Sequence, residues 1–252
     1  MTSDLLPISR IPRTGLPAHA VVVGAPERAV DAAALLEDRV QVAQHREYLT
    51  FTGTWQGLPV VVASHGVGAP GAVLLFQELA DAGVRTILRL GTAGAMQAGI
   101  EDGSLVIAQA AVRDDGVSHQ LLPPEYPAFA APETVLALQE AAEQAGVPYH
   151  RGVVWTRAAF QPGWLDLPGD TYVRAGVAAI EMELSALMVL ASARGLVAGG
   201  ALVVDGANAD DLVDVEATGG YDPHRKVVTD GVARGVRVSL DALCLLAKED
   251  GR

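Results

Sequence analysis

The segment Val21-Val22-Val23-Gly24-Ala25-Pro26-Glu27-Arg28 decides the fold, because it changes from an apolar strand to a helix within a few residues. The three valines predict a buried strand, and Pro26 favours the first turn of a helix that we expect to run from about Glu27 to Asp38. A turn at Gly24 leaves backbone N–H groups at a helix N-terminus, and Arg28 adds planar donors that suit phosphate. An ordinary helix start explains the same residues equally well.

The rest of the chain alternates between apolar strands and helical segments, which is typical of an α/β fold. We expect further strands at 48–55, 58–63, 86–90, 104–112, 150–156, 178–180 and 201–204, and helices at 69–82, 132–144, 183–194 and 224–248. The first two of these strands are joined by Gln56-Gly57 and predict an antiparallel pair, so the sheet should be mixed. Segments 113–131 and 158–176 are candidate functional loops, and 207–221 is the best candidate for disorder.

Composition limits the classes of protein to which the chain can belong. A chain of 252 residues, 50% of them hydrophobic, can bury a large core, so we expect one domain over residues 1–252. The net charge of -12 argues against a nucleic-acid partner. The single cysteine, Cys244, is expected to be a buried helix residue, which fits a reducing cytoplasm. We find no signal peptide and no apolar run long enough for a membrane span, so we expect a cytoplasmic protein.

Among the charged residues, Arg89 is the one whose position a purely structural role explains least well. It lies inside the apolar strand expected at 86–90, where an unpaired guanidinium would be costly, so it needs an anionic partner or ligand. We expect this strand to stop at a turn formed by Gly91-Thr92-Ala93-Gly94, with exposed N–H groups. Thr92 would then lie beside Arg89 at the mouth of the sheet.

Acidic residues follow two other expected strands. Glu181 and Glu183 flank Met182, and carboxylates can accept hydrogen bonds from vicinal sugar hydroxyls while a thioether packs against a flat apolar ligand. We expect no metal, because no histidine or third acid stands nearby at a ligand-like spacing. Asp205 follows the last core strand, where it is either a general acid or the cap of a turn.

Familiar hydrolase and nucleotide motifs are missing from the sequence. The histidines form no HExxH pattern, and we interpret His65, His119 and His150 as isolated residues. The sequence also lacks a Gly-x-Ser-x-Gly elbow and the lysine of a Walker loop.

Taken together, several short segments make the chain resemble the nucleoside phosphorylase family, especially its hexameric uridine and purine members. The resemblance runs from about Val21 to Leu246 and rests on residues 24–28, 45–47, 66–70, 89–94 and 112–116, on Phe160 and on residues 181–183. It implies a three-layer α/β/α domain with a mixed central β-sheet. It also implies phosphorolysis of a nucleoside to a base and a pentose 1-phosphate, with inorganic phosphate as co-substrate and no other cofactor.

The resemblance assigns roles to individual residues. In that family, phosphate is held by the residues that match Gly24, Arg28, Arg89 and Thr92. The residue matching Arg46 reaches the phosphate of the neighbouring subunit, so the resemblance implies a homo-oligomer with a hexamer as the inherited expectation. The ribose is bound by the residues that match Met182 and Glu183, with support from the one that matches Glu181.

The residues expected to contact the base are those at which the sequence departs from the family pattern. The residue matching Phe160 packs on the base, but the glutamine and arginine by which uridine phosphorylases recognise uracil are replaced here by Trp164 and Asp166. Gln161 is a possible substitute, and Trp164 could instead be a lid residue that never touches ligand. The N-terminal histidine of uridine phosphorylases is also missing, since Leu5-Leu6-Pro7-Ile8 occupies that stretch. We therefore favour a purine or modified base, with uridine as the alternative.

For a purine, Asp205 would protonate the ring nitrogen of the leaving base, with Arg225 as a partner that modulates it. Two other classes stay open, a nucleosidase that uses water and a binding protein without catalysis. Nucleosidases of this superfamily typically lack the arginines found here at positions 28, 46 and 89, and a binding protein would be expected to lose these arginines or Glu183. Both comparisons favour phosphorolysis.

Overall fold

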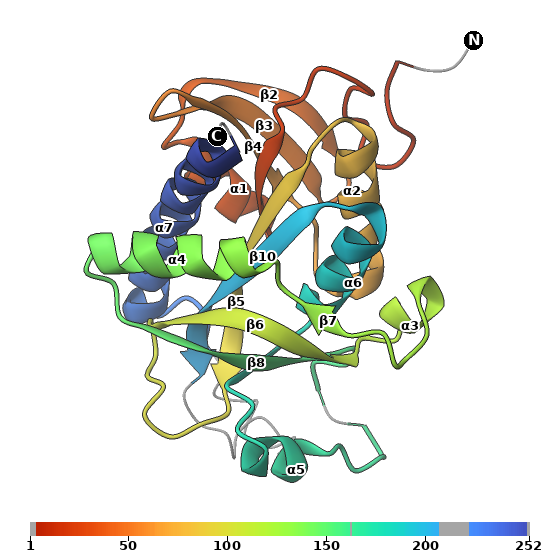
Figure 1. The fold of residues 1–252 in the computed structure, drawn as a ribbon, viewed down its shortest axis with the longest axis vertical. Coiled ribbons are helices and arrows are strands. Elements are labelled where there is room, and N and C mark those ends of the chain that lie inside the picture. Colours follow the sequence, from red (N-terminus) through yellow and green to blue (C-terminus); the bar gives the residue numbers. More distant parts are fainter. Residues whose placement is uncertain (1–3, 162, 207–221, 251–252) are drawn as a thin grey trace.

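The computed structural model describes residues 4–161, 163–206 and 222–250 (Figure 1). The strands are β1 (His19–Val23), β2 (Glu37–His45), β3 (Tyr48–Trp55), β4 (Leu58–Ser64), β5 (Thr86–Ala95), β6 (Leu105–Asp114), β7 (Ala128–Phe129), β8 (Tyr149–Arg157), β9 (Ala179–Glu181) and β10 (Val197–Gly206). The helices are α1 (Pro26–Ala33), α2 (Ala69–Asp81), α3 (Ser118–Leu121), α4 (Pro132–Gln144), α5 (Gly169–Arg174), α6 (Leu184–Arg194) and α7 (Lys226–Asp250).

The strands form one mixed sheet in the order β10-β6-β8-β9-β5-β1-β4-β3-β2, and β7 pairs with β6. An additional pairing between β10 and β5 joins five of these strands, β5, β9, β8, β6 and β10, into a ring. Helices α4 and α7 pack together on one side of the sheet, whereas α2 and α6 pack together on the other (Figure 1). The expected α/β fold with a mixed central sheet between helices is therefore confirmed.

Register explains why charged residues far apart in the sequence meet at one edge of the sheet. Strand β5 runs parallel to both β1 and β10, and Arg89 pairs with Val22 on one side and Gly200 on the other. The carboxyl ends of these three strands consequently point the same way. Strand β9 runs antiparallel to β5, with Ile180 opposite Gly94, so its last residue enters the same region from the other direction.

Three expectations about the elements need correction or restriction. The helix after β1 ends at Ala33, not near Asp38, because the exposed strand β2 already begins at Glu37. The expected turn at residues 91–94 is wrong: β5 continues to Ala95, since β10 and β9 pair with it over this stretch. The candidate disordered segment, 207–221, lies outside the described residues.

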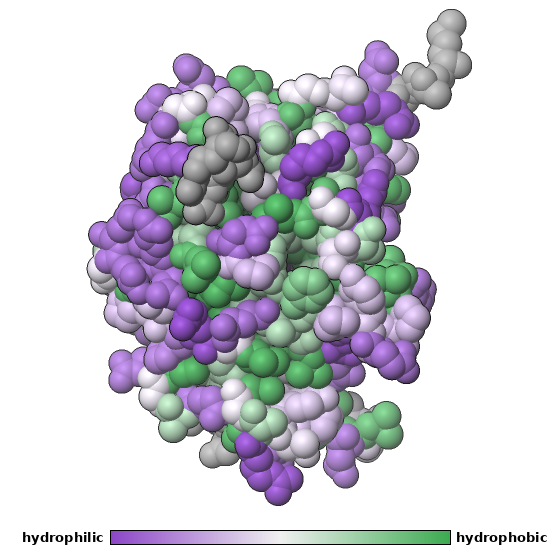
Figure 2. Space-filling model, viewed as in Figure 1, coloured by the Kyte–Doolittle hydropathy of each residue, from purple (hydrophilic) through white to green (hydrophobic). Residues whose placement is uncertain are grey.

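The core is built mainly from the valine-, leucine- and alanine-rich strands and the helix faces that cover them. Cys244 is buried in α7, as expected. Hydrophilic side chains cover much of the outer face seen in Figure 2, with apolar ones between them. In the described part of the chain, none of the helices has the length and apolar character needed to cross a membrane.

Candidate active site

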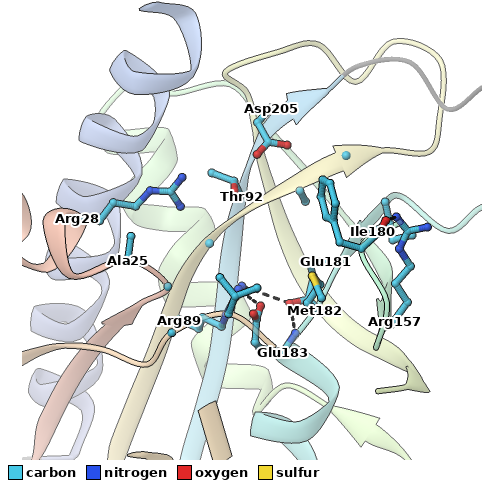
Figure 3. Close-up of a pocket in the computed structure, with 17 residues that line it drawn as sticks. Ala25, Arg28, Arg89, Thr92, Arg157, Ile180, Glu181, Met182, Glu183 and Asp205 are labelled. Carbon is cyan, nitrogen blue, oxygen red and sulfur yellow. Dashed lines mark hydrogen bonds and ion pairs between the residues drawn. The ribbon is translucent and has the colours of Figure 1, made fainter. Parts of the chain in front are cut away.

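A cavity of about 330 Å³ opens where β1, β5, β9 and β10 meet (Figure 3). Nine of the residues singled out in the sequence line it: Gly24, Arg28, Arg89, Thr92, Phe160, Glu181, Met182, Glu183 and Asp205. Its wall also includes Gly66, Val67, Arg157 and Ile180. Segments from Gly24 to Asp205 thus contribute to one pocket.

At the floor of the cavity, Arg89 forms ion pairs with two glutamates (Figure 3). Its Nη2 donates to Glu183 Oε2, and its Nη1 lies 3.3 Å from Glu181 Oε2. All three residues are only 4% exposed. The anionic partner that the buried position of Arg89 predicted is therefore this pair of carboxylates. Arg89 Nε and Nη1 have no hydrogen-bond acceptor among the described residues, so donors remain for a ligand anion.

Glu181 is the better fixed of the two carboxylates. It accepts hydrogen bonds from Thr156 Oγ1, from the Glu183 backbone N–H at 2.8 Å and from the Leu184 backbone N–H at 3.0 Å. The last two donors lie at the N-terminus of helix α6, where the helix dipole favours a negative charge. Burial nevertheless raises the pKa of Glu181, against the opposing effect of Arg89. Glu181 is thus held as a rigid support for its neighbours.

Glu183 has the opposite electrostatic balance. Burial alone would raise its pKa, but the Arg89 guanidinium and a backbone hydrogen bond from Gly68, at 2.6 Å, hold the pKa below its usual value. Glu183 is therefore an ionised acceptor in the cavity wall. Met182, between the two glutamates, places its thioether in the same wall (Figure 3).

His65 is not isolated as the sequence suggested, because it lies close enough to feel the charges of Arg89 and Glu183. The imidazole is fully buried, and its Nδ1 lies 2.7 Å from the backbone carbonyl of Gly66, which requires that Nδ1 carries the proton. Burial, followed by the effect of Arg89, lowers the pKa of His65 to about 4. The side chain is therefore neutral at pH 7 and adds no charge beside the ion pairs.

Three of the residues predicted to bind phosphate, Gly24, Arg28 and Thr92, gather at one end of the cavity, whereas Arg46 does not line it. Helix α1 begins there with Pro26, and its N-cap, Ala25, offers no side-chain hydrogen bond to the first turn. The Arg28 guanidinium points from α1 toward Thr92 on β5 (Figure 3). A backbone N–H cluster, a guanidinium and a hydroxyl therefore converge where an oxyanion can bind.

Close packing in β5 requires glycine beside Arg89. A Cβ at Gly91 would lie within 2.6 Å of Arg89 Cζ and closer still to a terminal nitrogen. Any larger residue at this position would push the guanidinium out of its ion pairs.

Asp205 and Arg225 are brought together by a hydrogen bond from the Arg225 side chain to the Asp205 backbone. Arg225 Nη2 donates to the backbone carbonyl of Asp205 at 2.7 Å, and Nη1 donates to Asp102 Oδ2 at 2.5 Å. This hydrogen bond to Asp102 raises the pKa of Arg225. Arg225 lies outside the cavity wall, whereas the Asp205 carboxylate lies in it and the residue is 4% exposed. Arg225 thus fixes the backbone that carries Asp205.

The opposite end of the cavity holds Phe160, Ile180 and an arginine that sequence reasoning missed, Arg157. Arg157 is the last residue of β8 and is 5% exposed. Its Nη2 donates to the backbone carbonyl of Phe160. The strand expected at 150–156 stops one residue short of Arg157, and the available signal is an arginine between a buried strand and Phe160.

Four other candidates lie away from the cavity wall. Gln161, Trp164 and Asp166 are exposed on the segment after β8, and the Trp164 side chain is fully exposed. Arg46 is exposed in the turn between β2 and β3, with a φ of 55°. Their assigned roles stay predictions. Within the described ranges, no cluster of three or more histidine, cysteine, aspartate or glutamate side chains could hold a metal ion.

The α/β fold brings donors that suit an oxyanion and a carboxylate that can accept hydrogen bonds from hydroxyls into one pocket. The model of the phosphorylase superfamily matches residues 18–242. A uridine phosphorylase of Thermococcus kodakarensis is 41% identical over 194 residues, covering 72% of this chain and 70% of that protein. A purine nucleoside phosphorylase of Plasmodium vivax is 33% identical over 232 residues, covering 91% of each chain.

Among solved structures, the purine nucleoside phosphorylase of Toxoplasma gondii in complex with immucillin-H superposes with a TM-score of 0.91. It is 29% identical and covers 99% of both chains. The chain therefore belongs to the phosphorylase superfamily, as one of its nucleoside phosphorylases, which are pentosyltransferases.

Proposed function

We propose that this protein cleaves the N-glycosidic bond of a purine nucleoside with inorganic phosphate, releasing the base and a pentose 1-phosphate. Phosphate is the co-substrate, and the reaction needs no other cofactor. One observation carries the proposal. The Arg89 to Glu183 ion pair joins a site for an oxyanion to a site for sugar hydroxyls, so that both reactants meet in one cavity.

Phosphate binds at the end of the cavity formed by the α1 N-terminus, Arg28 and Thr92. The two Arg89 nitrogens without a hydrogen-bond acceptor among the described residues add donors from below. Guanidinium groups and helix N-termini both favour a multiply charged anion. The net charge of -12 does not oppose this, because three arginines, Arg28, Arg89 and Arg157, line the cavity itself.

The pentose lies against Met182 and Glu183, with the Glu183 carboxylate accepting hydrogen bonds from two vicinal hydroxyls. Arg89 keeps this carboxylate ionised, which makes it a strong acceptor. The same contact fixes the sugar over the phosphate. Holding the two reactants in this geometry replaces a collision in solution by a step within one complex.

As the bond from C1′ to the base nitrogen lengthens, the pentose becomes oxocarbenium-like and the bonding electron pair moves to the base. The bound phosphate anion stabilises the positive sugar and then forms the new bond from its oxygen to C1′. Asp205 donates a proton to the ring nitrogen of the purine, so that the base leaves neutral. Arg225 positions Asp205 through its backbone carbonyl.

The preference for purines has two supports. The residues that replace the uracil-binding glutamine and arginine are both exposed and outside the cavity wall. The purine nucleoside phosphorylases of Plasmodium vivax and Toxoplasma gondii also align over nearly the whole chain. Uridine phosphorylase is the second candidate, because the relative with the highest identity named above carries that activity. Hydrolysis by water and binding without catalysis are less well supported, since Arg28, Arg89 and Glu183 all line the cavity.

We further propose a homo-oligomer in which Arg46 reaches the phosphate site of a neighbouring subunit, with a hexamer as the state inherited from the family. The exposed turn that carries Arg46 fits this role. The net charge gives no reason to expect nucleic acid as a partner.

Steady-state kinetics on inosine, guanosine, adenosine, uridine and thymidine with phosphate test the choice of base. We expect the highest kcat/KM for a purine nucleoside, and a higher value for uridine would overturn the purine assignment. Asp205→Asn should lower kcat on that purine by about 10²-fold or more with little change in KM. Asp230→Asn, on the exposed part of α7, is the matched control. An unchanged kcat in Asp205→Asn would remove Asp205 from the mechanism.

A further inference from the structure

Thr156 is a fully buried hydroxyl residue of β8 that lies next to the cavity without forming part of its wall. Its Oγ1 accepts a hydrogen bond from the Ser185 backbone N–H at 3.0 Å and donates one to Glu181 Oε1. The Ser185 hydroxyl points elsewhere and donates to Asp115 Oδ2 at 2.5 Å. Because the Ser185 N–H occupies one side of the Thr156 oxygen, the Thr156 hydroxyl proton is directed at the Glu181 carboxylate.

Glu181 connects this hydroxyl to the predicted phosphate site. Glu181 Oε2 lies 3.3 Å from Arg89 Nη1, while Arg89 Nη2 donates to Glu183 Oε2 (Figure 3). The guanidinium is therefore held by one carboxylate on each side. Its Nε and Nη1 have no hydrogen-bond acceptor among the described residues. These donors can serve a phosphate oxygen only while the guanidinium keeps this orientation.

The hold of Glu181 on Arg89 depends on the charge of its carboxylate. Burial raises the pKa of Glu181 against the opposing effect of Arg89, and the negative charge of Glu183 raises it further. The hydrogen bond from Thr156 lowers this pKa. His65, which acts on the same ion pairs, is neutral at pH 7. Removing the Thr156 hydroxyl would therefore favour the protonated form of Glu181 without changing any charged residue.

We propose that Thr156 is a positioning residue for phosphate: its hydroxyl keeps Glu181 ionised and in place, and Glu181 in turn presents Arg89 to the anion. This inference rests on the proposed function and concerns the same phosphate site. With Glu181 protonated, the guanidinium would be paired with Glu183 alone and could turn away from the anion. Phosphate would then have to order a mobile side chain when it binds, which lowers its affinity.

Two competing explanations lead to different results. If Thr156 only ties β8 to the start of α6, its loss destabilises the protein without a specific effect on phosphate. If charge alone mattered, protonation of Glu181 would remove a negative charge beside an anion site, and loss of the hydroxyl would tighten phosphate binding. The positioning role predicts weaker phosphate binding that worsens as the pH falls.

The test measures the Kd of inorganic phosphate by isothermal titration calorimetry at pH 6, 7 and 8.5 for the wild-type protein, Thr156→Val and Thr156→Ser. Valine lacks the hydroxyl, and we expect phosphate binding about tenfold weaker at pH 7. The ratio of the Kd of Thr156→Val to that of wild type should grow as the pH falls, because the pKa of Glu181 is higher in the variant. The ionisation of phosphate itself cancels in this ratio. Thr156→Ser keeps the hydroxyl and should stay within about threefold of wild type.

Ser185→Ala is the matched control. It removes a neighbouring buried hydroxyl that donates to Asp115, but it leaves the backbone N–H that Thr156 accepts. We expect Ser185→Ala to lose stability in urea while its Kd for phosphate stays within about twofold of wild type at each pH. If Thr156→Val does not fold, Thr156→Cys replaces it. A thiol is a weak donor, so the loss of affinity should lie between those of the valine and serine variants.

Unchanged or tighter phosphate binding by Thr156→Val, or a Kd ratio that does not vary with pH, would overturn the proposal. An equal loss of affinity in Ser185→Ala would also overturn it, because the effect would then not depend on the bond to Glu181. A wild-type protein that binds no phosphate would remove the proposed function together with this inference. Phosphate binding by wild type with no response to Thr156→Val would remove the inference alone.

Discussion

Replacing Arg89 by methionine should destabilise the protein strongly, because it removes the shared counter-charge of two buried carboxylates. Arg89, Glu181 and Glu183 are each only 4% exposed, so water cannot solvate the glutamates that remain. Removing one partner of a buried ion pair typically costs about 3–5 kcal/mol. We expect a loss of this size in the free energy of unfolding of Arg89→Met at pH 7, measured by urea denaturation.

The loss should also depend on pH. Without Arg89, the pKa of the two glutamates rises in the folded state above its value in the unfolded chain. The folded variant then binds more protons than the unfolded chain, so its stability relative to wild type increases as pH falls from 8 to 5. The raised pKa that burial already gives Glu181 in the wild-type protein points the same way.

A second substitution separates the charge effect from simple loss of packing. Adding Glu183→Gln to Arg89→Met removes one uncompensated charge and should recover about 1–3 kcal/mol. Arg85→Met is the control, because Arg85 is an exposed arginine whose side chain, among the described residues, donates to backbone carbonyls only, and it should stay within about 1 kcal/mol of wild type. An Arg89→Met protein as stable as wild type, with no dependence on pH, would refute the reasoning.

Three further predictions concern buried groups near the site and the N-terminal segment. Wild-type stability should fall as pH drops from 6.5 toward 4, because the folded pKa of His65 is about 4. His65→Gln should flatten this pH profile of unfolding by up to about 3 kcal/mol, whereas the exposed His119→Gln should not. Gly91→Ala displaces the Arg89 guanidinium and should raise the KM for phosphate about tenfold or more, so a wild-type KM would contradict the steric reasoning. The Glu78 carboxylate accepts three hydrogen bonds from residues 8 and 9, so Glu78→Ala should cost about 2–3 kcal/mol in urea unfolding, and a change below 0.5 kcal/mol would show that the segment is held by other contacts.

Much of the fold could be predicted from the sequence, because strands with both faces buried consist of runs of valine, isoleucine and leucine. The helix Pro132–Gln144 agrees with its expected range, since proline and a glycine-terminated last turn mark its ends. Strand β2 was missed because most of its residues are polar and exposed, as in an outer strand of the sheet. The extent of β5 was also missed. Its glycines look like a turn in the sequence, whereas pairing to strands on both sides keeps them extended.

The site was predictable where a charge interrupts an apolar strand, as at Arg89, or directly follows one, as at Asp205. A charged group at such a position needs a partner or a ligand, and both residues do line the cavity. The part of the site expected to bind the base was harder to predict from the sequence. Its residues lie on a segment whose path the local sequence does not determine. Trp164 stands out in the sequence as a substitution but is fully exposed, whereas Arg157, earlier in the chain, lines the cavity.

The most direct test of the central claim is ³¹P NMR of the wild-type protein incubated with inosine, with and without inorganic phosphate. An anion site joined to a pentose site predicts a new signal for ribose 1-phosphate that grows in step with hypoxanthine release, and no base release when phosphate is omitted. Release of hypoxanthine together with free ribose, at the same rate in both samples, would contradict phosphorolysis and show that water is the nucleophile.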